Sequence, residues 1–291
     1  MTIIAGFKCL DGIVVCADTQ ETVGNYSKRN VPKLRFEAPI GAMKVLGGYS
    51  NVALAVCGAG HGPFIDKLAD EAWKSVEVTK NIDEACIAAE EAIKRTYEEF
   101  GRIYQTGMCP EAELVYAVKM ESENRLFSAS GPIVNEKHDY CAAGVGVHMA
   151  DFLASRMYRR TLHVAQAIIV AAYVLFQTKE HVEGCGGGSH IAVLRDHGSS
   201  GLVNSENVDL ITKLVQSGDS EIGEILMRYA NVTISKDEFV QQSHELIAGI
   251  VTLREHEKSK LLELQRMTKE VFGMDLHDEL GLPKSTDDEL A

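Results

Sequence analysis

The chain has 291 residues, of which 45% are hydrophobic and 24% charged, and this composition excludes a largely disordered protein. A net charge of -13 argues against a nucleic-acid-binding protein that uses a broad basic surface. The longest apolar stretch, residues 165–176, is too short to span a bilayer, and no signal-peptide pattern is visible. We therefore expect a cytoplasmic protein that binds neither membranes nor nucleic acid.

The seven cysteines show no CxxC pair, and several of them lie inside apolar runs. This usage is typical of reduced cysteines that pack as small hydrophobic side chains. The ten histidines are scattered, without a His-Glu-x-x-His motif. The sequence therefore predicts neither a metal site nor a cofactor.

Periodicity predicts an alternation of strands and helices. Residues 2–10 and 13–18 are β-rich runs, and Asp11-Gly12 between them predicts a hairpin with a type I′ turn. Further strands are expected at 33–36, 44–46, 52–57, 113–120, 125–130, 140–144 and 190–195, and helices at 63–76, 82–104, 147–158 and 162–178. Two hairpin-built sheets with helix pairs outside would bury this pattern, which predicts an α+β fold in four layers, αββα.

The sequence pattern becomes helical and rich in charged residues after Val203. We therefore expect a domain over 1–203 and a helical C-terminal extension over 204–282. Residues 283–291 are expected to form a disordered tail. Ser235-Lys-Asp-Glu238 is a capping box that would begin a helix reaching Phe272, before Gly273. One face of this helix carries an apolar stripe that consists of Leu246, Ile250, Leu253, Leu261 and Leu264. Such a stripe needs a packing partner.

Thr2 is small enough for methionine aminopeptidase to remove Met1, which would leave a free α-amine beside a hydroxyl. An α-amine titrates near pH 8, so an appreciable fraction can accept a proton at neutral pH. One residue would then supply both nucleophile and base. Taken alone, Thr2 is equally consistent with an incidental residue on the first strand.

The residues that follow Thr2 favour the nucleophile over the incidental residue. Thr2-Ile-Ile-Ala-Gly6, the segment from Asp11-Gly12 to Asp18, Gln20–Asn25 and Asn30-Val-Pro-Lys-Leu34 together resemble the start of a proteasome β subunit. They are still more similar to the bacterial proteasome-like peptidase that works with a separate ATP-driven unfoldase. Relative to that pattern, the spacing from Asp18 to Lys33 is one residue shorter in this chain. Residues 142–146 and 183–188 extend the resemblance. It implies an N-terminal-nucleophile hydrolase fold, a ring of identical subunits and an ATP-dependent unfoldase as partner.

The resemblance also implies roles for individual residues. Thr2 would be the nucleophile, Lys33 would stabilise its alkoxide, and Asp18 would hold Lys33. Thr22 would lie on the strand along which an extended substrate peptide pairs. The backbone N–H of Gly58 would bind the oxyanion, with Ala55 as the alternative.

The resemblance also assigns positions that would support the catalytic residues, and at some of these positions the chain departs from the family pattern. Glu183 would stand in for a supporting aspartate, whereas Val145 and Gly186 occupy the places of two supporting serines. By the same resemblance, Val31 and Val56 would line the pocket for the residue before the cleaved bond and favour an apolar side chain.

Three functions follow from these observations. The leading one is a threonine-type peptidase that cleaves peptides or unfolded proteins inside a self-assembled ring. The alternatives are an inactive ring scaffold, which Val145 and Gly186 favour, and an N-terminal-nucleophile amidase that acts on small amides. The glycine-rich segment 58–62 also suggests a phosphate-binding loop, but it lacks the Rossmann spacing and a following Gly-Lys-Ser/Thr.

Overall fold

A computed structural model describes residues 2–23, 27–38, 52–103, 109–197, 200–231, 233, 235–256, 262 and 266. The chain divides into two compact units, Met1–Val208 and Asp209–Ala291. Several predictions lie outside the described residues: the strand at 44–46, the helix end at Phe272, the stripe residues Leu261 and Leu264, and the tail at 283–291.

The first unit contains two five-stranded antiparallel sheets. One has the order β10 (Tyr140–Ala143), β1 (Ile4–Lys8), β2 (Gly12–Asp18), β11 (Ser189–Arg195) and β12 (Gly201–Leu202). The other has the order β5 (Leu34–Glu37), β6 (Val52–Gly60), β7 (Ala112–Met120), β8 (Glu123–Ser130) and β9 (Ile133–Lys137). All seven residues of β2 are buried, as expected for a strand that is covered on both faces of its sheet.

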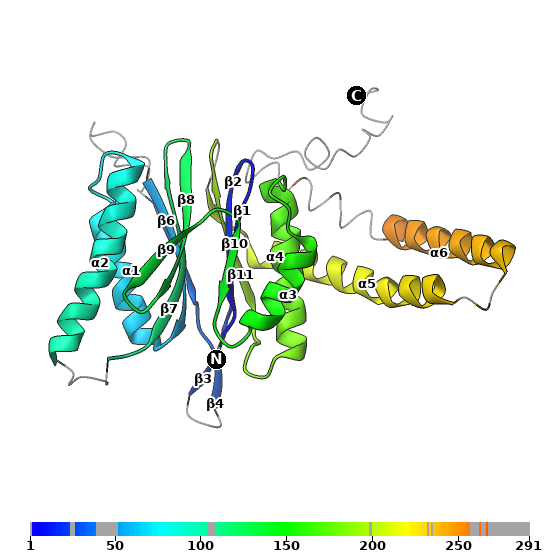
Figure 1. The fold of residues 1–291 in the computed structure, drawn as a ribbon, viewed down its shortest axis with the longest axis horizontal. Helices are drawn as coiled ribbons and strands as arrows, with labels where there is room; N and C mark the ends of the chain where they lie inside the picture. The colour runs from blue at the N-terminus through cyan, green and yellow to red at the C-terminus, as the bar shows by residue number, and fades with distance from the viewer. Residues whose placement is uncertain are drawn as a thin grey trace. The chain divides into compact units, whose positions relative to one another are not determined.

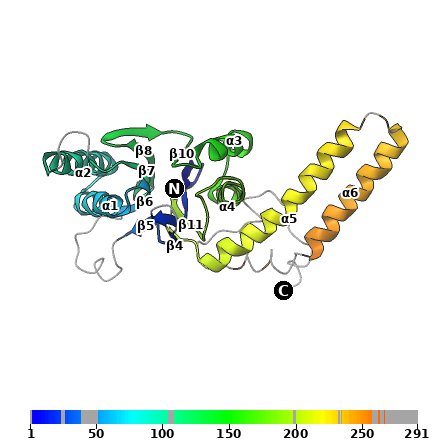
Figure 2. The same cartoon turned by 90° about the horizontal axis from the view of Figure 1, so that it is seen from below.

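One face of each sheet packs against the other sheet through an apolar core that includes Ile4, Val15, Ala55, Val115 and Leu126. Helices α1 (Gly62–Val76) and α2 (Ile82–Ile103) pack on the sheet that contains β6 and β7. Helices α3 (Val147–Met157) and α4 (Val164–His181) pack on the sheet that contains β2 and β10 (Figure 1). The view in Figure 2 shows the same two helix pairs on either side of the strands. The fold therefore mixes sheets and helices, as predicted.

The first helix pair forms because α1 carries buried apolar residues every three or four positions, among them Phe64, Leu68 and Ala72. Phe64 packs edge-on against Tyr97 of α2, with ring centroids 4.9 Å apart. The imidazole of His61 accepts the Phe64 N–H at 3.3 Å and caps the helix. These contacts hold α1 at the end of β6, next to the start of β5.

The predicted first hairpin is confirmed, but its type I′ turn is wrong. Cys9, Leu10 and Asp11 connect the two strands, and Asp11 does not adopt the positive φ that a type I′ turn requires. The physical reason is that tertiary contacts hold the Asp11 side chain. The Asp11 carboxylate accepts the Val164 N–H at the start of α4 at 2.8 Å and binds Arg195 at 3.3 Å.

The C-terminal unit contains the antiparallel pair formed by α5 (Ser205–Ala230), which begins just before the unit boundary, and α6 (Lys236–His256). Within the pair, Arg228 donates to the Gln242 carbonyl at 2.9 Å. The Glu238 N–H donates to the Ser235 hydroxyl at 3.2 Å, as the predicted cap requires. No helix in the described part of the chain is long and apolar enough to cross a membrane.

Candidate active site

Thr2 and Asp18 meet because β1 and β2 are neighbours in one sheet. The Asp18 N–H donates to the Ile3 carbonyl at 3.1 Å, and the Ile3 N–H donates back to the Asp18 carboxylate at 3.2 Å. Thr2, the residue before Ile3, therefore lies beside the end of β2. Thr2 is 4% exposed and Asp18 is fully buried.

Lys33 connects these two residues. It precedes β5, and its ammonium donates to Thr2 Oγ1 at 2.5 Å and to Asp18 Oδ1 at 2.7 Å. It also donates to the backbone carbonyl of Gln20. The Lys33 side chain is 7% exposed, so this cation acts on the threonine oxygen with little screening by water.

The second oxygen of Asp18 is also bound. Asp18 Oδ2 accepts the N–H of Gly186, in the segment after α4, at 2.9 Å. Backbone donors from two separate segments thus orient the carboxylate that faces Lys33. The arrangement resembles a fixed acid–cation–hydroxyl chain, in which the lysine can stabilise negative charge that develops on Thr2 Oγ1.

A turn at Gly144–Gly146 holds the carbonyl of Thr2. The Gly146 N–H donates to this carbonyl at 3.3 Å. Gly144 has φ +90, and a Cβ there would lie 2.3 Å from the same oxygen, so no other residue fits. The Gly144 N–H donates to Glu113 at 2.8 Å. Val145 is 46% exposed and offers no hydroxyl, so backbone groups position Thr2 at this turn.

The structure accounts for glycine at position 186. A Cβ at Gly186 would lie 2.6 Å from Oε1 of Gln20, so a serine would fit only if the Gln20 side chain moved. Glu183, in contrast, is exposed, and no hydrogen bond or ion pair in the described chain joins it to Thr2 or Lys33. The structure therefore brings Gln20 to the position that the sequence assigned to a supporting serine, and leaves Glu183 outside the cluster.

The two candidates for the oxyanion donor occupy different places on β6. The Gly58 N–H donates to the Lys33 carbonyl at 3.3 Å, a long bond next to the candidate site. Ala55 pairs with Phe36, further along β5 and away from Lys33. A Cβ at Gly58 would meet Ile65 of α1 at 2.2 Å, so helix packing requires glycine there. Gly58 is thus the nearer candidate.

Thr22 lies on β3 (Gln20–Val23), which pairs with β4 (Ser27–Asn30). Its hydroxyl oxygen and the amide nitrogen of Gln20 are both buried, and neither has a hydrogen-bond partner among the described residues. Residues 20 and 22 share one face of the strand because side chains alternate. Two unsatisfied polar groups therefore lie on the strand that passes the lysine.

Sequence reasoning missed Cys185, which is 6% exposed and lies beside the cluster. A Cβ at Gly146 would lie 3.1 Å from its sulfur. Burial and the negative charge of Asp18 raise the pKa of the Cys185 thiol to about 11, although the positive charges of Lys33 and the chain's amino terminus act in the opposite direction. The thiol stays protonated at neutral pH and is a poor nucleophile. Across the described ranges, no group of three or more His, Cys, Asp or Glu residues could hold a metal ion.

Solved structures share this fold. Anbu described as an ancestral beta-subunit, from Yersinia bercovieri, matches with a TM-score of 0.59 at 14% identity, covering 80% of this chain and 98% of that one. A Gly-1 mutant of Anbu from Hyphomicrobium sp. strain MC1 matches with a TM-score of 0.58 at 13% identity, covering 81% and 99%. The helical assembly of the Anbu complex from Pseudomonas aeruginosa gives 0.59 at 13%, covering 76% and 95%.

These likenesses confirm, at the level of the fold, the resemblance to proteasome β-type subunits that the sequence predicts. No protein-family model and no curated protein sequence matches the chain.

Proposed function

We propose that the chain is a threonine-type peptidase with an N-terminal nucleophile, active inside an assembly of identical subunits. The observation that carries this proposal is the Lys33 ammonium, bound at once to Thr2 Oγ1 at 2.5 Å and to Asp18 at 2.7 Å. In this reading the sheets and helix pairs are the four-layer αββα sandwich of N-terminal-nucleophile hydrolases.

The chemistry begins once Met1 is removed and Thr2 carries a free α-amine. The amine takes the hydroxyl proton while Thr2 Oγ1 attacks the substrate carbonyl, and Lys33 stabilises the charge on the oxygen. The C–N bond then breaks, and the proton passes to the leaving amine. Water hydrolyses the resulting ester on Thr2 and restores the hydroxyl.

Other groups of the site have supporting roles. Asp18 orients Lys33, and Gly146 positions the backbone of Thr2. The Gly58 N–H is the proposed oxyanion donor, and it would exchange its 3.3 Å bond to Lys33 for one to the developing oxyanion. Thr22 lies on β3, the strand along which the substrate backbone would pair in this proposal, and the unsatisfied side-chain groups of Gln20 and Thr22 belong to the same strand. Glu183 keeps no role in this proposal, because it is exposed.

Assembly is part of the proposal, because one of the similar structures is itself a helical assembly. Identical subunits joined head to tail form a ring if the rotation closes and a helix if it does not. A ring therefore remains the expectation from the sequence, and a helix is the open form of the same kind of contact. An ATP-driven unfoldase as partner and a cytoplasmic location stay predictions.

One alternative function, the inactive scaffold, is supported by a specific observation. Val145 and Gly186 lack the hydroxyl groups that the family pattern places near the threonine, which favours an inactive scaffold with the same fold. An amidase that acts on small amides shares the site chemistry and differs only in substrate.

Substitution of the nucleophile tests the proposal. Thr2→Ala removes the hydroxyl and should lower peptide hydrolysis by at least about 1,000-fold, whereas Thr2→Ser keeps a hydroxyl and should retain measurable activity. The measurement is the steady-state rate with fluorogenic peptides, with intact mass confirming that Met1 is absent from each variant. Full activity of Thr2→Ala would contradict the mechanism, and a parent protein that lacks Met1 yet cleaves neither peptides nor small amides would favour the scaffold.

A further inference from the structure

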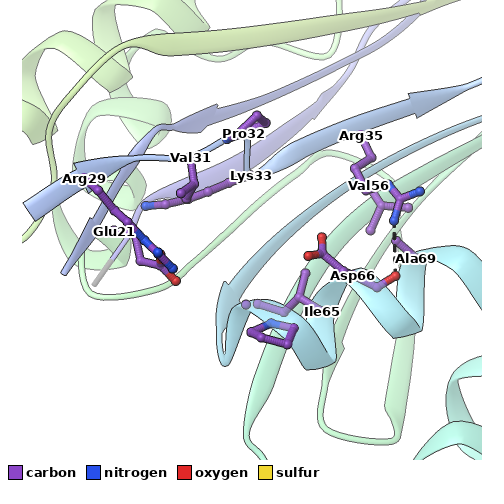
Figure 3. A pocket seen from close by; sticks show the side chains of 12 residues that line it. Glu21, Arg29, Val31, Pro32, Lys33, Arg35, Val56, Ile65, Asp66 and Ala69 are labelled. Carbon is purple, nitrogen blue, oxygen red and sulfur yellow. Dashed lines mark hydrogen bonds and ion pairs between the residues drawn. The ribbon is translucent and has the colours of Figure 1, made fainter. Parts of the chain in front are cut away.

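A pocket of about 160 Å³ opens beside Lys33, between the start of β5 and the first turns of α1. Figure 3 shows Val31 and Pro32 on one side and Ile65 and Ala69 of α1 on the other. Val56, from β6, also lines the pocket. An apolar wall therefore leads away from the ammonium that contacts Thr2.

Charged residues also line this pocket, and most of them are already neutralised. Arg35 pairs with Glu37 at 3.1 Å and with Asp70 at 2.6 Å. Arg29 pairs with Glu21 at 2.5 Å, and Lys33 is bound to Asp18. The cations of the pocket thus have carboxylate partners within the chain, so they offer little free charge to an acidic side chain.

Asp66 is different. The structure shows no ion pair or hydrogen bond to its carboxylate anywhere in the described residues, although its backbone carbonyl accepts from Arg35 at 3.2 Å. Asp66 is exposed on α1, and Figure 3 shows its side chain directed into the pocket, toward the segment of Val31 and Lys33. It is the carboxylate that lines the pocket without a cation of its own among the residues that the structure describes.

We propose that this pocket selects a basic side chain, lysine or arginine, on the residue before the cleaved bond, and that Asp66 determines the selectivity. This inference rests on the proposed peptidase function. The apolar wall formed by Val31, Val56 and Ile65 takes the methylene groups of such a side chain, while the charged end reaches Asp66. The proposal revises the apolar preference that Val31 and Val56 alone suggest.

The test is selectivity between matched substrates. Blocked fluorogenic peptides that differ only in lysine, norleucine or glutamate before the cleaved bond share similar length and flexibility. For the protein without Met1 we expect kcat/KM to be about tenfold higher with lysine than with norleucine, and lowest with glutamate. Asp66→Asn should bring the lysine-to-norleucine ratio close to one, and Asp66→Lys should move the preference to glutamate.

Asp83→Asn is the matched control. Asp83 is also an exposed aspartate, on α2 and paired with Arg125, and it does not line this pocket. The substitution changes the net charge by the same amount, so it should leave the selectivity ratio unchanged. A fall in the ratio for both variants would show a general charge effect and would overturn the role of Asp66.

Hydrolysis and covalent labelling together distinguish a loss of the proposed selectivity from a loss of the proposed peptidase function. Hydrolysis with equal rates for lysine and norleucine, or a preference that Asp66→Asn leaves intact, overturns the selectivity alone. No hydrolysis of any peptide, together with no labelling of Thr2 by lysine and norleucine peptide electrophiles, overturns the peptidase function and the selectivity with it. Faster labelling by the lysine electrophile, abolished in Asp66→Asn, supports both.

Discussion

At the scale of single residues, the Lys33–Asp18 pair links the stability of the protein to its chemistry. Both side chains are almost fully buried, with exposed fractions of 7% and 0%. Two charges taken out of water are tolerated because each has its partner and further hydrogen bonds. The removal of one charge leaves the other buried and unpaired, which costs stability and, in the proposed mechanism, also activity.

Asp18→Asn tests this link. The amide keeps the shape of the side chain but leaves the Lys33 ammonium without a counter-charge, so we expect a loss of about 3 kcal/mol in the free energy of unfolding. Peptide hydrolysis should fall at least about 100-fold because Lys33 loses its orientation. The measurements are urea unfolding and kcat/KM. Asp83→Asn, at an exposed ion pair, should change stability by less than about 1 kcal/mol, and equal losses in the two variants would contradict the account.

The residues of the candidate site could be predicted from the sequence only in part. Thr2, Asp18 and Lys33 lie near the ends of predicted strands, and their contact in the structure follows from the pairing of β1 with β2 and the position of β5. Their catalytic roles remain predictions. Gln20 and Cys185 could not be found from the sequence, because their proximity depends on how the segment after α4 folds against the end of β2.

At the scale of elements, buried segments were easier to predict than exposed ones. The strands with a strong apolar pattern, such as β6 and β7, are found close to their predicted positions. Strands β4 and β9 were missed, because β4 is exposed throughout and β9 is a largely exposed edge strand without apolar alternation. The type I′ turn predicted at Asp11-Gly12 is wrong because a tertiary contact with α4, which the local sequence does not reveal, determines the conformation of Asp11.

The turn before α3 gives a prediction at this scale. Gly144→Ala requires a side chain at φ +90 and places its Cβ 2.3 Å from the Thr2 carbonyl, so both stability and hydrolysis should fall, the latter at least about tenfold. Gly131→Ala is the matched control, since Gly131 also has a positive φ, +57, but open space around its Cβ. It should cost about 1 kcal/mol in stability and leave kcat/KM unchanged. Equal activity losses in the two variants would contradict the positioning role of the turn.

At the scale of the whole molecule, the C-terminal unit presents apolar side chains to solvent. Ile247 and Val251 of α6 are 57% and 53% exposed, one turn apart on the helix. Two neighbouring exposed apolar side chains make this face of α6 a candidate surface for association. The compact units divide after Val208, whereas the sequence suggested a domain end at 203, and the regulatory role expected for the extension stays a prediction.

Charge on this surface should weaken assembly. We expect Ile247→Glu to shift the protein toward smaller species in sedimentation-velocity experiments, because a carboxylate resists burial in an apolar contact. Gln241→Glu, at an exposed polar position of the same helix, adds the same charge and should leave the distribution unchanged. An unchanged distribution in Ile247→Glu would exclude α6 from the contact, and a monomeric parent protein at micromolar concentration would remove the assembly from the proposal.

If Thr2 is the N-terminal nucleophile, a covalent adduct with a substrate-like electrophile must form on this residue. The purified protein is incubated with a peptide electrophile directed at threonine, and intact mass is followed by peptide mapping. We expect a chain without Met1 that carries one adduct, located on Thr2. The adduct should be absent from Thr2→Ala, and it should form much more slowly in Lys33→Ala. A chain that retains Met1, or an adduct located on Cys185 instead of Thr2, would contradict this role of Thr2.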